Sequence, residues 1–344
     1  MRRILQIQRA RRGVALIFTL LVLAVLITLV ATLSTSSKLD IMQAENTRDD
    51  EQNKILLDSA IRLVEHVLLQ DLQNSKFDSF HEPWAKPVKD LVVGESTISW
   101  EMVDEGGKLN INLLAIGDDR QKDTMQQVLA RLVKRVSDDN GVVLRGSDVV
   151  TIIQRDPYQL AVQGILEFLE KKIEEASSKG AIVVEDQKIR LLRPILFEID
   201  ELIGVQGMTP ELLYGYRGNK GLADYLTVWS DMLVNVNTAP EAVLKALVED
   251  FTDEDVKTIV DYRATNDITK VDDVAEIQGV QPSALEELRR VVSVTSRYFV
   301  ASIRVKTGNL ERTAKVVLRR PDIAKVAAGE APPTVGIVYY KSGV

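Results

Sequence analysis

The sequence predicts an α+β protein: a long N-terminal membrane and stem helix packs on an antiparallel sheet, and a large helical domain is inserted between the strands. Three observations predict this fold. An uncharged run from Val14 to Leu33 contains neither Gly nor Pro and continues into a polar helical pattern. One strand pattern precedes a long block of helical patterns, and three or four strand patterns follow it. Helices segregated from strands along the chain are typical of α+β proteins.

The apolar run is long enough to cross a membrane. Its 20 residues would span about 30 Å as a helix, which is the hydrocarbon thickness of a bilayer. Thr19, Thr28 and Thr32 are its polar side chains, and their hydroxyls can bond to carbonyls of the preceding turn. Five arginines and no acidic residue precede the run, which predicts a cytoplasmic N-terminus. A buried core helix is the alternative, and the uninterrupted length disfavours it.

The helical pattern continues from Ser34 to about Asp71 without Gly or Pro, so membrane segment and stem are expected to form one helix of more than 50 residues. Residues 42–54 are charged all round and are expected to be exposed. From Ile55 onward one apolar stripe is expected to pack on a domain. The stripe consists of Ile41, Ile55, Leu56, Ala60, Val64, Val67 and Leu68.

The strands flank the helical block. Residues 96–103 alternate between apolar and polar, which predicts a half-buried strand after a loop at 74–88. After the block, residues 291–296, 299–305 and 313–318 are rich in β-branched and aromatic residues, and 335–340 could add a strand. Gly308-Asn309 predicts a hairpin turn. We therefore expect a leader at 1–13, the membrane and stem helix at 14–73, a sheet domain at 88–109 and 290–344, and an inserted helical domain at 110–289.

The helical block, from 118 to about 287, contains a repeated theme. Residues 202–213 and 274–285 both read apolar-Gln-Gly-apolar-x-Pro when Gly207 is aligned with Gly279. Each predicts a helix, a Gly turn and a second helix beginning near Pro, which is a helix-hairpin-helix shape. Residues 125–136 and 162–176 are amphipathic, and 180–192 could form a short hairpin.

Helix-hairpin-helix units often bind DNA phosphates, so a membrane-anchored DNA receptor of a DNA-uptake system is the main alternative function. Nucleic-acid binding requires a basic surface. The turns here are flanked by Gln206, Gln278 and Gln281, and many acidic residues follow Asp250. No nucleic-acid partner is therefore expected, and the hairpins are expected to serve packing or protein contacts.

Composition excludes several kinds of site. The chain has no cysteine, so it has no disulfide, thiolate metal site or thiol nucleophile. His66 and His81 lie in a polar region and are read as surface residues. No Gly-x-Ser-x-Gly, phosphate-binding Gly loop or His-Glu-x-x-His occurs, so an enzyme is not expected. The net charge is −7, and −12 without the five leader arginines, which favours cations over polyanions as ligands.

The start of the chain resembles a type IV pilin-like prepilin signal. Arg11-Arg12-Gly13-Val14-Ala15-Leu16 has the basic leader, the Gly and the apolar helix of that family. The resemblance implies cleavage after Gly13 by a prepilin peptidase and N-methylation of Val14. A cleavable secretory signal is the alternative, but the apolar run is too long for it and no good Ala-x-Ala site follows.

Three further features resemble the K-type minor pseudopilins of type II secretion systems. Phe18 occupies the fifth mature position, where most pilins have Glu; a Leu-Asn-x-Asn-Leu run spans 109–113; and Asn-x-Asn-Thr-Ala-Pro spans 235–240. In the second run, Asn237 or Thr238 is expected to cap the helix that Pro240 begins. Phe18 could also be an ordinary apolar residue of a signal anchor.

The resemblance implies a single-pass inner-membrane protein with a cytoplasmic N-terminus and a periplasmic body. Such a subunit would initiate assembly and cap the tip of the pseudopilus, together with the I- and J-type minor pseudopilins and the major pseudopilin, to drive export across the outer membrane. Through this family, residues 38–70 would bundle with the stems of the I- and J-type subunits.

Calcium is the one cofactor that the resemblance implies. Family members commonly have Trp-Ile-Asp-x-Asp after the second helical segment, whereas this chain has Glu167-Phe168-Leu169-Glu170. The candidate ligands are Asp104, Asp156, Glu167 and Glu170, because carboxylate oxygens are the ligands that calcium prefers. The alternative is that these are solvated surface acids.

Overall fold

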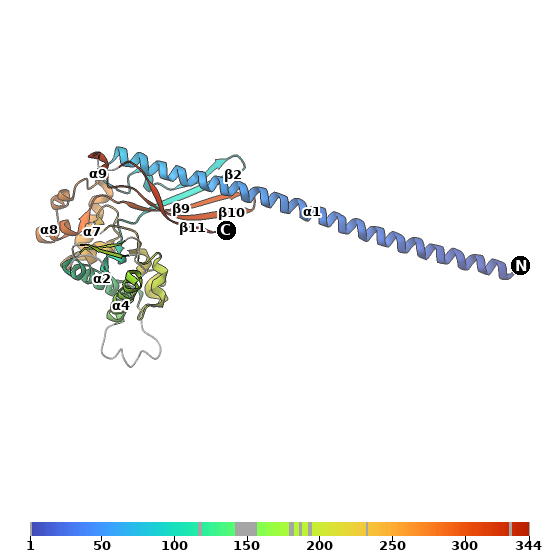
Figure 1. The fold of residues 1–344 in the computed structure, drawn as a ribbon, viewed down its shortest axis with the longest axis horizontal. Coiled ribbons are helices and arrows are strands. Elements are labelled where there is room, and N and C mark those ends of the chain that lie inside the picture. The colour runs from blue at the N-terminus through green and yellow to red at the C-terminus, as the bar shows by residue number, and fades with distance from the viewer. Residues whose placement is uncertain are drawn as a thin grey trace.

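The computed structural model describes residues 2–115, 119–141, 157–178, 182–185, 188–191, 195–231, 233–329 and 332–343. One helix, α1 (Arg2–Asn74), is 73 residues long. Its N-terminal half projects from the rest of the molecule, and its C-terminal half lies along the sheet (Figure 1). The helices of the inserted block lie at the far end of the sheet, away from the projecting helix (Figure 1). The predicted α+β fold is thus confirmed.

The main sheet has five antiparallel strands in the order β1-β2-β9-β10-β11. Their bounds are Val88–Val93, Ser96–Asp104, Tyr298–Thr307, Leu310–Arg319 and Gly336–Gly343. The chain leaves the sheet after β2 and returns at β9, and everything between belongs to the helical block. Gly308, with φ +56°, forms the tight turn between β9 and β10 as predicted. Strand β1 begins at Val88, where the predicted loop at 74–88 ends, and it was not predicted as a strand.

The C-terminal half of α1 covers one face of the sheet. The buried stripe on the helix is Leu57, Ala60, Ile61, Val64 and Leu68. It packs against the inward-facing side chains of β2, β9 and β10, including Trp100, Phe299 and Val316. Trp84, in the short 3₁₀ helix η1 (Pro83–Ala85), closes this core edge-on to Phe299 at 5.0 Å between ring centroids. Ile55 was expected in the buried stripe, but its side chain is 66% exposed.

Polar contacts fix where α1 first meets the sheet. Asn53 is fully buried; its amide donates to the Leu310 carbonyl at 3.2 Å and its side-chain oxygen accepts from the Thr307 hydroxyl at 2.6 Å. Arg312 on β10 forms a two-pronged ion pair with Asp50 at 2.6 and 3.0 Å. The predicted exposure of residues 42–54 therefore fails at this end of the range, because these polar groups face the sheet.

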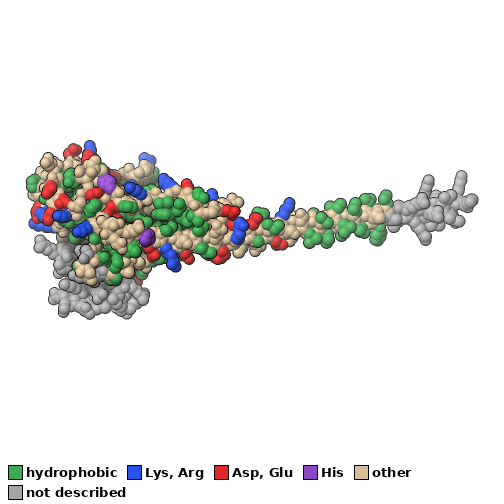
Figure 2. All heavy atoms as spheres, turned by 90° about the horizontal axis from the view of Figure 1, so that it is seen from above, with side chains coloured by type: hydrophobic (Ala, Val, Ile, Leu, Met, Phe, Trp, Pro, Cys, Tyr) green, Lys and Arg blue, Asp and Glu red, His purple; other side chains and the backbone are tan. Residues whose placement is uncertain are grey.

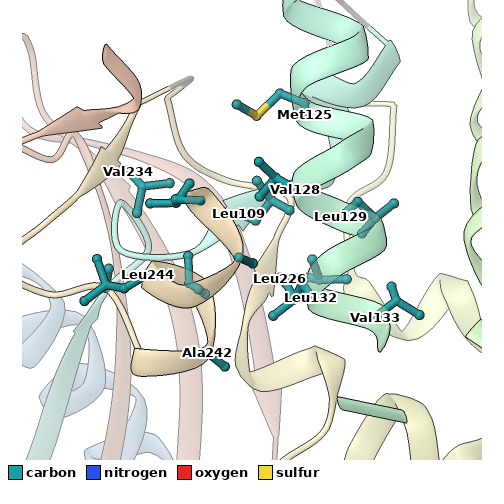
Figure 3. Close-up of a cluster of buried hydrophobic side chains, with 14 of the residues drawn as sticks. Leu109, Met125, Val128, Leu129, Leu132, Val133, Leu226, Val234, Ala242 and Leu244 are labelled. Carbon is teal, nitrogen blue, oxygen red and sulfur yellow. The ribbon is translucent and has the colours of Figure 1, made fainter. Parts of the chain in front are cut away.

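The helical block has its own apolar core. In Figure 3, Val128 and Leu132 of α2 point toward Leu109 and Leu226. Its helices are α2 (Asp119–Asn140), α4 (Pro157–Ser178), α5 (Pro210–Tyr214), α6 (Glu241–Leu247), α7 (Asp253–Thr265) and α8 (Pro282–Val291). Its 3₁₀ helices are η2 (Ile111–Ala115), η3 (Ile199–Gly204), η4 (Leu222–Asp224) and η5 (Val271–Glu276).

Short strand pairs complete the block. Two parallel bridges join β3 (Leu109–Asn110) to β6 (Leu226–Thr227), and β7 (Val234–Asn235) to β8 (Val292–Ser293). The hairpin expected within 180–192 is present as β4 (Ile182–Glu185) and β5 (Lys188–Leu191). One more short helix, α9 (Ile323–Ala327), follows β10.

The two repeated segments form equivalent turns, but in each the first helix is a 3₁₀ helix. Gly207 and Gly279 both have positive φ, +80° and +94°, which favours glycine. The first turn is covered by α4: a Cβ on Gly164 would lie 2.2 Å from the Gln206 carbonyl oxygen, so only glycine allows this approach. The second turn is open, since Gln278 is exposed.

Candidate assembly interface

The N-terminal part of α1 is an uncovered apolar rod. An 18-residue window within Leu16–Asn74 has a mean hydropathy of 2.9, and none of it is buried. The hydroxyls of Thr19 and Thr32 donate to carbonyls one turn back at 2.8 Å, as predicted. These bonds satisfy the polar groups that a bilayer would leave unpaired. Phe18 is 66% exposed on this rod.

An exposed apolar surface flanks the stem where it joins the body. Ile55 and Leu63 on α1 and Leu91, Val92 and Val93 on β1 are each more than a third exposed. We call these five residues the stem patch. The amide of Gln52 on α1 donates to the hydroxyl of Ser96 at 2.9 Å, and Ser96 pairs with Val93, so the helix and the β1 edge are neighbours. Figure 2 shows hydrophobic side chains gathered where α1 lies on the sheet.

A buried ion-pair cluster joins the end of the stem to the body. Arg320, which follows β10, is fully buried and pairs with Asp71 of α1 at 2.5 Å and with Asp78 of the following loop. Its Nε donates to the Ser296 carbonyl at 3.0 Å. Burial raises the pKa of Asp71 to about 6 and the pKa of Asp78 to about 8, although Arg320 acts in the opposite direction on both. We call Asp71, Asp78 and Arg320 the joint cluster.

Asp104, at the end of β2, holds the helical block against the sheet. Its carboxylate accepts hydrogen bonds from Gly106 N–H at 2.7 Å, Thr238 Oγ1 at 2.5 Å, Ser296 Oγ at 2.7 Å and Asn235 Nδ2 at 3.0 Å. Complete burial raises the pKa of Asp104, while these four donors act to lower it. Buried polar groups with every donor and acceptor satisfied fix a unique arrangement, here the angle between block and sheet.

The prediction that Asn237 or Thr238 caps the start of α6 is wrong. The side chain of Thr238 donates to Asp104, and the side chain of Asn237 accepts from Ile268 N–H at 3.0 Å and donates to the Ile268 carbonyl at 2.9 Å. Helix α6 begins after Pro240 without a side-chain cap. The Asn-x-Asn-Thr run therefore ties distant segments together instead of capping a local helix.

Comparison with known proteins finds similarity to one component of type II secretion systems. Residues 234–295, which hold the Asn-x-Asn-Thr run and the second hairpin, match the model of type II secretion system protein K. The chain is 24% identical over 314 residues to the putative type II secretion system protein K of Escherichia coli K12, covering 85% of this chain and 88% of that protein. The chain is thus similar to type II secretion system protein K over most of its length.

Two further comparisons agree. Protein K of Pectobacterium carotovorum subsp. carotovorum is 22% identical over 310 residues, which cover 87% of this chain and 89% of that protein. The crystal structure of the GspK-GspI-GspJ complex from the enterotoxigenic Escherichia coli type 2 secretion system shares the fold, with a TM-score of 0.56 at 17% identity. That match covers 88% of this chain and 99% of the compared chain.

The sequence-predicted processing and assembly residues all lie on α1. Gly13 and Val14 fall within the continuous helix Arg2–Asn74, and Phe18 follows just over one turn after Val14. Cleavage after Gly13 would leave the remaining helix from Val14 onward intact. The roles of these three residues stay predictions.

The predicted calcium ligands are not assembled in the described part of this chain. Asp104 is surrounded by hydrogen-bond donors, which is the environment of a satisfied carboxylate and does not fit a cation ligand. Glu167 and Glu170 are exposed on α4, where Glu167 accepts from Gln163 at 2.7 Å. Asp156 lies outside the described residues.

Among the described residues, the carboxylates close enough to share a metal ion are Asp71, Asp78 and Glu82. The guanidinium of Arg320 already pairs with the first two. Glu82 accepts from Ser79 N–H and from the Trp84 indole, both at 3.0 Å. A protein cation therefore occupies the position that a metal would need.

Proposed function

We propose that this chain is the minor pseudopilin at the tip of the type II secretion pseudopilus, where it initiates assembly with the I- and J-type minor pseudopilins. The observation that carries the proposal is Phe18: an apolar side chain at the fifth position after the predicted cleavage site, exposed on an uncovered membrane-length helix. The similarity of the chain to type II secretion system protein K gives this position its meaning.

A charged side chain inside a membrane raises the free energy of the protein. A carboxylate at this depth is expensive unless a partner charge meets it. A subunit with a carboxylate at this position is stabilised when it assembles behind another subunit, because the N-terminal amine of that subunit supplies the partner charge. A subunit with Phe18 has no charge to satisfy, so it can assemble with no subunit ahead of it.

The stem patch is the proposed contact surface for the I- and J-type subunits. Its five exposed apolar residues lie on α1 and on β1, and the opposite face of α1 is already buried on the sheet. Exposed apolar residues that gather near one another often mark protein interfaces. The related GspK was crystallised in a complex with GspI and GspJ, which supports these partners. The major pseudopilin would follow this group in the shaft.

The proposed topology is a single inner-membrane pass with a cytoplasmic N-terminus and a periplasmic body. The arginine-rich leader supports this orientation. Prepilin peptidase would cut after Gly13 and methylate Val14. Mass spectrometry of the purified membrane form is expected to give an N-terminus at Val14; an N-terminus near Ser37 would instead indicate a conventional signal peptide.

The tip assignment is tested by Phe18→Glu. The variant is expected to lower secretion and to appear within the shaft, because its new carboxylate needs a subunit ahead of it. Val22→Glu, one turn deeper, is the matched control for the general cost of a membrane carboxylate, and Phe18→Leu should behave as wild type. Full secretion by Phe18→Glu, with wild-type crosslinking to the I- and J-type subunits, would contradict the proposal.

The contact surface is tested separately. The chain has no native cysteine, so single cysteines engineered at Val92 or Leu63 report contacts without background. Val92→Lys is expected to weaken co-purification with the I- and J-type subunits, whereas Val338→Lys on β11, also an exposed edge position, should not. Equal loss by both variants would show that the effect is not specific to the stem patch.

The DNA-receptor alternative is not favoured by the hairpins. The first turn is closed by α4 through Gly164, and near the second turn Arg289 is already paired with Asp272 and Glu286. Retention of the protein on DNA at physiological salt, lost at higher salt, would support that alternative.

Calcium binding through Asp104, Asp156, Glu167 and Glu170 is tested by titration calorimetry, with Glu167→Gln and Glu170→Gln as variants.

A further inference from the structure

The outer face of the sheet, opposite α1, carries a hollow of about 670 Å³ that crosses all five strands. Residues on this face alternate along β2 and β9 with the buried residues that contact α1, so they point away from the helix. We call the hollow the basic trough. Its lining includes Ser99 and Glu101 on β2, Ser302 and Arg304 on β9, Lys315 on β10 and Lys341 on β11.

The strand register explains the shape of the basic trough. Arg304 pairs across the sheet with Ser99 on one side and with Thr313 on the other, and Thr313 pairs with Gly343. In the adjacent row Ser302 pairs with Lys315. Short side chains therefore form the floor, and long cationic side chains stand among them, which produces a hollow in an otherwise continuous sheet face.

The cations in the basic trough lie close together, and only two of the three have an acidic partner among the described residues. Lys315 pairs directly with Lys341, and like charges directly opposite each other in a sheet are destabilising. Arg304 lies diagonally from Lys315, within the range over which long side chains interact. Arg304 and Lys341 each have one acidic neighbour, Glu311 at 3.3 Å and Glu198 at 2.8 Å. Within the described part of the chain Lys315 has no ion pair.

This concentration of cations is unusual for the chain, whose net charge is −7. An exposed sheet face is normally polar with both signs interspersed. Here Arg304, Lys315 and Lys341 line the hollow on β9, β10 and β11, where none of the described lining residues is acidic, whereas Lys89 on β1 stands beside Asp90 and Glu101 on β1 and β2. An anionic ligand is therefore favoured at the β9–β11 half over the half that carries both signs.

An aromatic wall stands next to the cationic half. Tyr339 is two residues before Lys341 on β11, so both side chains lie on the same face. Its ring packs on Trp229 at 5.9 Å, and Trp229 packs on Phe197 at 6.4 Å between centroids. Phe197 remains 46% exposed. A ligand in the trough therefore meets cations and, beside them, apolar ring surface.

We propose that the basic trough binds an acidic segment of a partner protein, with its carboxylates over Arg304, Lys315 and Lys341 and an apolar side chain against the aromatic wall. Strands are spaced about 4.8 Å apart, and carboxylates one turn apart on a helix are about 5–6 Å apart, so one segment can reach cations on adjacent strands. Inorganic anions and lipid headgroups match the cations but have no apolar group to place on the wall.

The test measures binding of a fluorescent peptide of alternating Glu and Ser that ends in Phe, by anisotropy, to the full-length protein in detergent. The matched peptide with Gln in place of Glu is the control ligand. The acidic peptide is expected to bind more tightly, and its affinity should fall as salt is added. Lys315→Gln and Arg304→Gln are each expected to weaken it by about two- to fivefold, the range of an exposed ion pair.

Two variants distinguish the trough from general charge. Glu101→Gln should bind the acidic peptide at least as tightly as wild type, because it removes a repelling charge. Lys257→Gln, an exposed lysine on α7, should leave binding unchanged. The inference is overturned if the Gln peptide binds equally well, if Lys257→Gln weakens binding as much as Lys315→Gln, or if inorganic phosphate or anionic vesicles compete as strongly as the unlabelled acidic peptide.

Discussion

Replacing Arg320 by methionine removes the cation that holds the joint cluster together. The guanidinium is fully buried, pairs with Asp71 and Asp78, donates to the Ser296 carbonyl and lies over the Phe299 ring at 4.8 Å. Methionine has a similar length but supplies neither charge nor donors. The variant therefore leaves two buried carboxyl groups without their cation and removes the hydrogen bond that Arg320 gives to the Ser296 carbonyl, while Asp78 keeps its bond from the Ser296 N–H.

The expected loss of unfolding free energy is about 3–5 kcal/mol at about pH 8, the range for breaking a buried ion pair by removing one partner. The loss should shrink toward pH 5, because Asp71 and Asp78 can take up protons and avoid an unpaired charge. Arg297→Met is the matched control. Arg297 pairs with Asp231 while remaining a third exposed, so its loss is expected to cost at most about 1 kcal/mol.

Denaturant unfolding of the full-length protein in detergent, followed by tryptophan fluorescence, measures these differences. Trp84 and Trp100 lie in the core between α1 and the sheet, so they report the affected region. Adding Asp71→Asn and Asp78→Asn to Arg320→Met should recover part of the loss, because no buried charge then remains in the cluster. A cost below about 1 kcal/mol, or the same cost at both pH values, would refute the reasoning.

Two other changes test the packing and the electrostatics by the same assay. Gly164→Ala is expected to lose about 1–3 kcal/mol, because its Cβ would lie 2.2 Å from a backbone carbonyl oxygen. Gly204→Ala, whose Cβ would meet nothing within 4 Å, should change little; equal effects would contradict the close approach. The wild-type unfolding free energy should receive a contribution from Asp71 and Asp78 that is lost as pH rises from about 4 to about 8. The raised pKa values of both groups mean that the folded state holds protons that the unfolded chain releases near pH 3.9. The Asn variants of both should lack this slope, and a wild-type slope of the same size in those variants would assign it to other groups.

The sequence predicted elements whose signal is local. Helix α1 has an uninterrupted apolar run and no breaker, and β2 alternates regularly, so both were predictable. Strand β1 was missed because Val88 to Val93 does not alternate and contains a register shift at Asp90, which has φ +50°. Ile55 was assigned to the buried face because the helical periodicity shows that an apolar stripe exists but does not show which residues at its border are buried.

The buried polar contacts could not be predicted in the same way. Asn235 bonds to Asp104, 131 residues away, and Arg320 pairs with Asp71, 249 residues away. Nothing local distinguishes these side chains: Thr238 reads as a helix cap, and Arg320 reads as one of two consecutive surface arginines before a proline. The roles of these side chains depend on partners far away in the sequence, and these partners can be identified only when the fold is known.

The unbroken helix also sets a clearance between bilayer and body. The apolar segment ends at Leu33, and Asp50 is the first residue beyond it on α1 that forms an ion pair with a strand of the sheet, through Arg312. The 16 residues between Leu33 and Asp50 correspond to about 24 Å of helix. Only a slender stalk crosses that gap, so a neighbour that enters it must itself be rod-shaped, while globular parts of neighbouring proteins can meet this chain only beyond the stalk.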